Sequence, residues 1–203
     1  MSIMISPRAV VMTKDFEQHF CESKVDNAID NDFGEKVDRQ LVDIYGSYRM
    51  LFIDTCFGLA NELVEDYPTG FWHVAELKQA DSFFIFPAGR GVKSFRFNAI
   101  DSKGEINRRY DLDEKTLGML VSLLAFDKCK QYAIEAQKGA DLVASKGGEA
   151  TYHDGVAAKI FHAKRAELLT MLVSTTEELA GTATETDALA NIALREFILC
   201  FAD

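Results

Sequence analysis

The sequence contains little proline, no long apolar run and no paired cysteine motif. Three prolines among 203 residues exclude long proline-rich linkers. No apolar run approaches the roughly 20 residues of a transmembrane helix, and the first residues lack the cationic and apolar regions of a secretory signal. No C-x-x-C pair occurs, and all four cysteines have apolar neighbours, which is typical of reduced thiols: Cys21, Cys56, Cys129 and Cys200. These absences predict a bacterial-type cytoplasmic protein that needs no disulfide.

Motifs that commonly carry catalysis or metal binding are also scarce. Residues 87–94 superficially resemble a phosphate-binding loop, but Val92 separates the glycine from Lys93 and a strand pattern follows, which indicates a hairpin turn. No two histidines have the i, i+3 or i, i+4 spacing of helical metal ligands: His19, His73, His153 and His162. A cysteine–histidine pair that meets only in space stays open. No catalytic residue, cofactor site or metal site is predicted, and the chain is not expected to be an enzyme.

The net charge is acidic and unevenly distributed. The chain carries a formal charge of −10, with a pI of about 4.9. Residues 1–66 contain 13 acids and 6 bases, whereas residues 87–110 contain 6 bases and 2 acids. Direct nucleic-acid binding is not expected, because contacts to a phosphate backbone rely on basic surface. The alternation around Phe95 and Phe97 is typical of a strand that packs both rings into a core; base stacking on the rings is the alternative.

Hydrophobic periodicity predicts helices before and after a strand-rich middle. Residues 1–36 show no sustained period and are expected to form a mobile or loosely packed arm. Apolar residues from Val37 to Val64 recur at three- and four-residue spacing, which predicts one long helix. Gly46 and Gly58 within this stretch suggest that another element packs closely there, because glycine otherwise disfavours a helix.

The remaining periods predict short strands followed by three helices. The expected strands are residues 71–77, 83–87, 93–100 and 106–112, joined by short linkers. The expected helices run from a capping box at Asp111–Glu114 to about Gln137, from Tyr152 to Leu179, and from a cap near Thr184 or Thr186 to the end. A loop is expected between Gly139 and Gly147.

This order predicts an α+β fold with a three- or four-stranded antiparallel sheet covered by helices, and an additional C-terminal helical region. Its expected parts are an arm (1–36), an α+β core (37–138) and C-terminal helices packed on that core (139–203).

Three blocks of the central sequence resemble the ArdB/KlcA-type antirestriction family of plasmids and mobile elements. The first is the helix Tyr48–Leu63 with the following EDYPTGFWHVAEL at residues 65–77. The second is SFFIFP at residues 82–87, an aromatic strand ending on proline. The third is YDLDEKTLGMLVSLLAF at residues 110–126, a capped helix with an early glycine. The likeness covers about residues 40–136, and the N-terminal arm, the long C-terminal region and a longer loop between the second and third strands depart from it.

The resemblance implies a protein that blocks type I restriction of incoming DNA. Its partner would be the type I restriction–modification enzyme or an associated host protein, bound without catalysis and without a cofactor. The candidate interaction residues lie in the first block: Tyr67, Gly70, Trp72 and Glu76.

Full DNA mimicry is not expected from the charge. About 40 Å of duplex bears on the order of 24 charges, whereas this whole chain has a net charge of −10. A local acidic patch on the first helix and the arm would still fit a basic groove on a partner. Two alternatives remain: an interaction module of a mobile element that self-associates, and a small-molecule or catalytic domain with a cleft beside Trp72 and Glu76.

Overall fold

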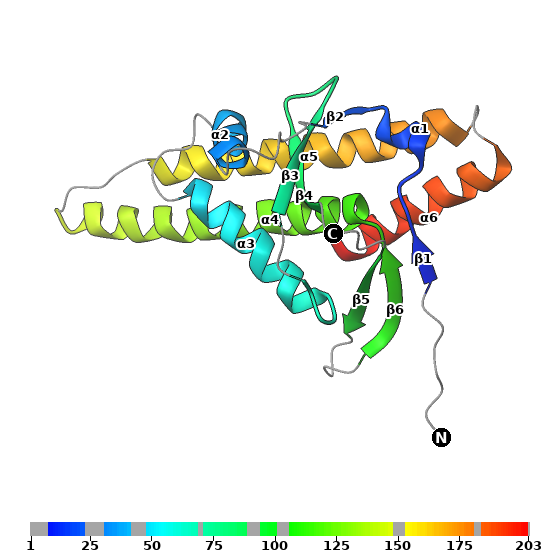
Figure 1. Cartoon of the computed structure of the whole chain (residues 1–203). Helices are drawn as coiled ribbons and strands as arrows, with labels where there is room; N and C mark the ends of the chain where they lie inside the picture. Colours follow the sequence, from blue (N-terminus) through cyan, green and yellow to red (C-terminus); the bar gives the residue numbers. More distant parts are fainter. Residues whose placement is uncertain are drawn as a thin grey trace.

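Helices surround two small β-sheets in the computed structural model of the chain (Figure 1). The predicted α+β class is confirmed. The structure describes the following residues: 8–22, 31–41, 48–68, 71–88, 94–100, 106–147, 153–180 and 184–202.

Three long helices contain most of the helical residues that the structure describes. α4 (Glu114–Ser145) and α5 (His153–Ala180) run antiparallel, and α6 (Glu185–Ala202) folds back toward the beginning of α4 (Figure 1). The Thr184 Oγ1 atom accepts a hydrogen bond from the Asp187 backbone N–H, so the cap of α6 lies where the sequence predicts it.

Three shorter helices precede them in the chain. They are α1 (Lys14–Glu17), α2 (Asn31–Gln40) and α3 (Tyr48–Leu63). The single helix predicted from Val37 to Val64 is therefore wrong, because α2 and α3 are separate helices. Both helices have apolar residues at helical spacing, so in the sequence the two patterns look like one continuous helix.

The four strands between residues 71 and 112 occupy the predicted positions but do not form one sheet. β3 (Phe71–Leu77) pairs antiparallel with β4 (Phe83–Ala88), and β5 (Phe95–Ile100) pairs antiparallel with β6 (Ile106–Leu112). Each pair belongs to a different three-stranded sheet. The predicted single sheet is thus corrected to two hairpins in separate sheets.

Each hairpin receives its third strand from the N-terminal region. β2 (Phe20–Glu22) lies antiparallel to β3, which gives the order β2-β3-β4. β1 (Arg8–Val10) lies parallel to β6, which gives the order β1-β6-β5. The N-terminal region therefore contributes to both sheets.

Residues 8–22 pack into the fold, so the prediction of a loosely packed arm is wrong for this part. The side chains of Val10, Phe16 and Phe20 are buried. The Thr13 hydroxyl donates a hydrogen bond to Asn191 Oδ1 on α6 at 2.8 Å. Elements of three or four residues are too short to show a period in the sequence, which explains the error.

Aromatic rings join the first sheet to α3, α4 and α5. Phe52 of α3 stacks on Phe126 of α4 with ring centroids 4.6 Å apart. Phe83 of β4 lies 5.5 Å from Phe52 and 5.6 Å from Phe126. Phe161 of α5 lies 6.4 Å from Phe126. All four side chains are fully buried, so burial of apolar surface is the main stabilising contribution here.

The edge of β4 is covered directly by α4. The Ser122 hydroxyl accepts a hydrogen bond from the Ile85 N–H at 3.0 Å and lies 3.3 Å from the Ile85 carbonyl oxygen, to which it donates. Gly118, one turn earlier, allows the two backbones to approach, because a Cβ atom there would lie 2.2 Å from Phe86 Cβ. The helix thereby satisfies polar groups that an edge strand would otherwise leave unpaired.

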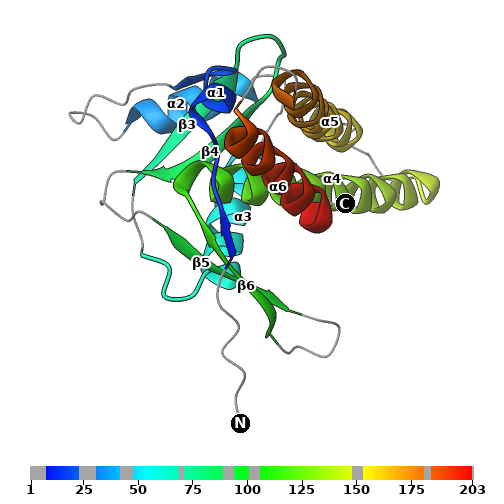
Figure 2. The same cartoon turned by 90° about the vertical axis from the view of Figure 1, so that its right-hand side faces the viewer.

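Helix α6 covers the second sheet (Figure 2). Phe97 of β5 lies 5.5 Å from Phe197 and 5.0 Å from Phe201, both on α6. Tyr110 of β6 lies 4.8 Å from Phe197. Without α6 this aromatic face of the hairpin would be exposed to solvent, so the C-terminal helix is part of the core.

Two expectations about glycines are wrong. A Cβ atom at Gly58 would meet no described atom within 4 Å, so none of the described elements packs against it. Gly46 lies outside the described residues. Gly139 lies inside α4, which continues to Ser145, and the predicted loop therefore begins later. A glycine in an exposed helix costs only about 1 kcal/mol, which the packing of the rest of α4 offsets.

The expected boundaries at residues 36 and 138 fall inside helices. The first lies within α2 and the second within α4. Buried residues from Val10 to Ala202 form one hydrophobic cluster. The expected parts of the chain therefore share a single core.

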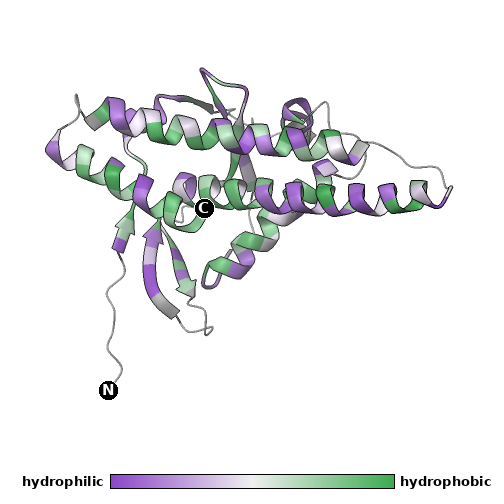
Figure 3. Cartoon of the chain, turned by 180° about the vertical axis from the view of Figure 1, so that it is seen from behind, coloured by the Kyte–Doolittle hydropathy of each residue, from purple (hydrophilic) through white to green (hydrophobic). Residues whose placement is uncertain are grey.

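The long helices have mixed polarity along their length. Figure 3 shows hydrophilic and hydrophobic residues interspersed in α4 and α5. Across the ranges that the structure describes, none of the helices is both long enough and apolar enough to span a membrane.

Candidate functional site

Trp72, the aromatic centre of the first resemblance block, is a buried packing residue. It is 5% exposed, and its ring centroid lies 5.0 Å from that of Phe57 on α3. The ring is thus buried against this helix. Phe71 beside it points the other way and is 63% exposed, as alternation along a strand requires.

Tyr67 links the two sheets. Its ring lies 6.3 Å from Trp72 of β3 and 6.0 Å from Phe95 of β5. Burial raises the pKa of the Tyr67 hydroxyl to about 12, and an interaction with Trp72 lowers it in part. Among the described residues, the buried Tyr67 hydroxyl oxygen has no hydrogen-bond partner within normal distance and angle. The neutral phenol is therefore held mainly by aromatic packing.

Glu76 lies at the other end of β3 from Trp72. Its Oε1 atom accepts a hydrogen bond from Gln40 Nε2 of α2 at 2.8 Å. At about 3.3 Å per residue, four residues of strand separate the two positions by roughly 13 Å. Gly70 lies outside the described residues. The structure thus brings Tyr67 and Trp72 together, and it places Glu76 in a separate contact that ties α2 to β3.

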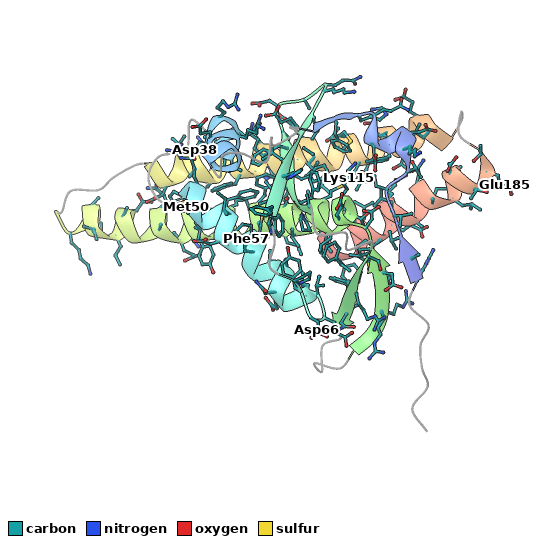
Figure 4. The ribbon with its side chains drawn as sticks, in the orientation of Figure 1. Asp38, Met50, Phe57, Asp66, Lys115 and Glu185 are labelled. Carbon is teal, nitrogen blue, oxygen red and sulfur yellow. The ribbon has the colours of Figure 1, made fainter. Side chains whose placement is uncertain are left out.

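The exposed face of α3 and the turn after it carry an acidic ridge, defined as Asp54, Glu62, Glu65 and Asp66. All four side chains are exposed. Met50 and Asp66 lie at opposite ends of this segment (Figure 4). Glu65 is 3.8 Å from Arg96 of β5, an exposed pair that contributes little to stability. The ridge is the structural form of the acidic patch expected on the first helix.

The basic strand β5 does not present a stacking platform. Phe95 and Phe97 are 5% and 2% exposed, so the core-packing interpretation is confirmed and the rings are inaccessible to bases. Arg96 on the opposite face lies 3.8 Å from Glu65 and 3.9 Å from Asp111. Its charge is thereby partly compensated within the protein.

Metal-binding groups do not converge in the part of the chain that the structure describes. No three histidine, cysteine or acidic side chains there are arranged to hold an ion. Cys56 and Cys129 are buried free thiols. Burial raises the pKa of both, to about 12 for Cys129. These thiols are therefore protonated and weakly nucleophilic at neutral pH.

A cleft lies away from Trp72, between α5 and the first sheet. His19, Leu77, Gln79 and Ala80 line one side, and Glu167 and Glu178 of α5 belong to the other. The cleft hypothesis beside Trp72 and Glu76 did not identify these residues. The two sides of the cleft lie about 90 to 160 positions apart in the sequence. The only local sign of the cleft in the sequence is the helical spacing of polar residues on α5.

Neither a known protein-family model nor a curated protein matches this chain. The family likeness of residues 40–136 therefore depends on the three blocks and on how they pack. The arrangement places an exposed acidic ridge beside the buried Tyr67–Trp72 pair.

Proposed function

We propose that this protein is an antirestriction protein that protects incoming unmodified DNA from type I restriction. It acts in the bacterial cytoplasm by binding the type I restriction–modification enzyme or an associated host protein, and it does so without catalysis or a cofactor. The contact between the three resemblance blocks carries the proposal.

The three blocks are separate in sequence, yet they pack on one another. Phe52 of the first block packs on Phe83 of the second and on Phe126 of the third. Phe83 of the second block packs on Phe126 of the third. Gly118 of the third block directly meets Phe86 of the second. Blocks that resembled the family by chance would not need to contact one another in the fold. Their packing as one unit therefore supports the resemblance.

The acidic ridge is the proposed contact surface. It lies on the helix of the first block, and an exposed Met50 adds apolar area near its other end. Complementary charge accelerates association and selects a basic partner surface. Since the ridge holds few charges, it would match a local basic groove and not a whole DNA-binding channel.

The direct test is plating of unmodified phage on a restricting host with and without the protein. We expect expression to raise the plating efficiency on type I hosts and to leave it unchanged on a host without restriction. Unchanged plating across several type I systems would refute the proposed function. A stable dimer in solution together with unchanged plating would favour the self-associating module instead.

A charge variant tests the ridge itself. The variant Asp54→Asn, Glu62→Gln and Asp66→Asn removes three charges from exposed positions; Asn suits position 66, where φ is 52°. The matched control removes three exposed charges elsewhere: Glu135→Gln, Glu185→Gln and Glu196→Gln. We expect the ridge variant to lose protection and the control to keep it, both with wild-type melting. Protection retained by the ridge variant would place the contact on another surface.

A further inference from the structure

The cleft between α5 and the first sheet has a volume of about 320 Å³, which is within the range of small-molecule sites. His19 follows α1, and Leu77, Gln79 and Ala80 come from the end of β3 and the turn after it. The α5 residues complete the lining: Ala166, Glu167, Thr170, Met171, Ser174, Thr175 and Glu178.

The α5 wall is acidic at both ends and hydroxylated between them. Glu167, Thr170, Ser174 and Glu178 follow one another at three- and four-residue spacing, so they share one face of the helix. At 1.5 Å per residue, the two carboxylates lie about 16 Å apart along the axis. Among the described residues that line the cleft, none is a lysine or an arginine. Its formal charge therefore favours a cation.

The nearest buried cation on α5 is already paired. Lys164 Nζ donates hydrogen bonds to Asp81 Oδ1 at 2.8 Å and to the Asp81 carbonyl oxygen at 2.7 Å. This ion pair fixes the turn between β3 and β4 against α5. It leaves Glu167, one turn further along, to other partners.

Glu167 has an unmet requirement for a hydrogen-bond donor. Its Oε2 atom is shielded from solvent, and no donor among the described residues reaches it. A buried carboxylate oxygen without a donor is costly. Glu167 also lines the cleft, and the terminal torsion of glutamate is broad, so its carboxylate can adopt more than one orientation there.

We propose that this cleft binds a linear aliphatic polyamine. One ammonium group pairs with Glu167 and another with Glu178, while the methylene chain lies along Met171, Leu77 and Ala80. The hydroxyls between the two acids accept hydrogen bonds from an inner amine. This site is independent of the acidic ridge and of the antirestriction proposal.

Calorimetric titration with spermidine in a buffer without amines tests the site. We expect saturable binding at physiological salt, reduced at least about tenfold by Glu167→Gln, because the charge-assisted hydrogen bond is lost. The matched control Glu135→Gln makes the same change of charge on an exposed part of α4 and is expected to bind like the wild type. The neutral chain 1,6-hexanediol is expected not to bind.

A second variant keeps the proposal testable if Glu167→Gln fails to fold. Thr170 is exposed on α5, and Thr170→Lys places a cation in the cleft while retaining a good helix former. We expect this variant to melt like the wild type and not to bind spermidine. Absence of saturable binding to the wild type, or equal binding by the wild type and both cleft variants, would overturn the proposal.

Discussion

Gly118 and Gly139 both lie inside α4, but their surroundings differ. A Cβ atom at position 118 would lie 2.2 Å from Phe86 Cβ and 2.5 Å from the Ile85 carbonyl oxygen. A Cβ atom at position 139 would meet none of the described atoms within 4 Å. The first glycine is required by the contact between α4 and β4, whereas the second only lowers helix propensity.

The two glycines therefore predict opposite effects of the same substitution. Gly118→Ala is expected to lower the free energy of unfolding by about 2 kcal/mol or more, because backbone atoms have to move. Gly139→Ala is expected to raise it by roughly 0.5–1 kcal/mol. Urea denaturation of both variants measures the difference. If Gly118→Ala were as stable as the wild type, α4 could not lie this close to β4.

The candidate site was predictable as a motif but not as a geometry. Its aromatic and acidic residues are visible in the sequence, and the burial of Trp72 follows from the period change at Gly70. That Tyr67 faces Phe95 of the other sheet does not follow, because periodicity within a segment says nothing about which segments meet. The cleft residues His19 and Glu167 were missed for the same reason.

At the scale of elements, Asp113 joins three parts of the chain. Its Oδ1 atom accepts a hydrogen bond from the Thr116 N–H, which caps α4. Its Oδ2 atom accepts one from the Met12 N–H, between β1 and α1, at 2.6 Å. One carboxylate thus begins the longest described helix and holds the N-terminal segment in place.

Replacing Asp113 tests this junction. Asp113→Ala is expected to lower the free energy of unfolding by about 2–4 kcal/mol, the sum of a lost cap and an unsatisfied backbone N–H. Asp113→Asn keeps one acceptor oxygen and is expected to lose less. Denaturation gives the stability, and hydrogen exchange at Met12 reports the local contact. Equal protection of the Met12 amide in wild type and Asp113→Ala would contradict the role.

The elements themselves were largely predictable, whereas their pairing was not. Strands 71–77 and 106–112 have the predicted bounds because alternation and turn residues are local signals. The split into two sheets depends on pairs such as Arg8 with Tyr110, about a hundred residues apart. Loop closure over such distances leaves no periodic trace, so the N-terminal strands escaped prediction.

At the scale of the whole molecule, the region of family resemblance does not complete its own core. Phe161 of α5 packs on Phe126, and Phe197 of α6 packs on Phe97. Phe20 of the N-terminal region meets Phe84 of β4 at 4.9 Å. The parts outside the region of resemblance are therefore structural components, and they also supply most of the residues that line the cleft.

The same core predicts that stability depends neither on a bound metal nor on a disulfide. Cys56 and Cys129 are buried free thiols whose pKa is raised by burial, and Cys200 is an exposed free thiol. Protonated, buried thiols are poor metal ligands and react slowly with oxidants. We expect the melting temperature to be unchanged by EDTA and by dithiothreitol, at the same pH and ionic strength.

A drop of several degrees with EDTA would reveal a metal site, and a drop with dithiothreitol would reveal a disulfide that supports the fold. Repeating either experiment with Cys21→Ser would show whether Cys21, whose side chain the structure does not describe, is responsible.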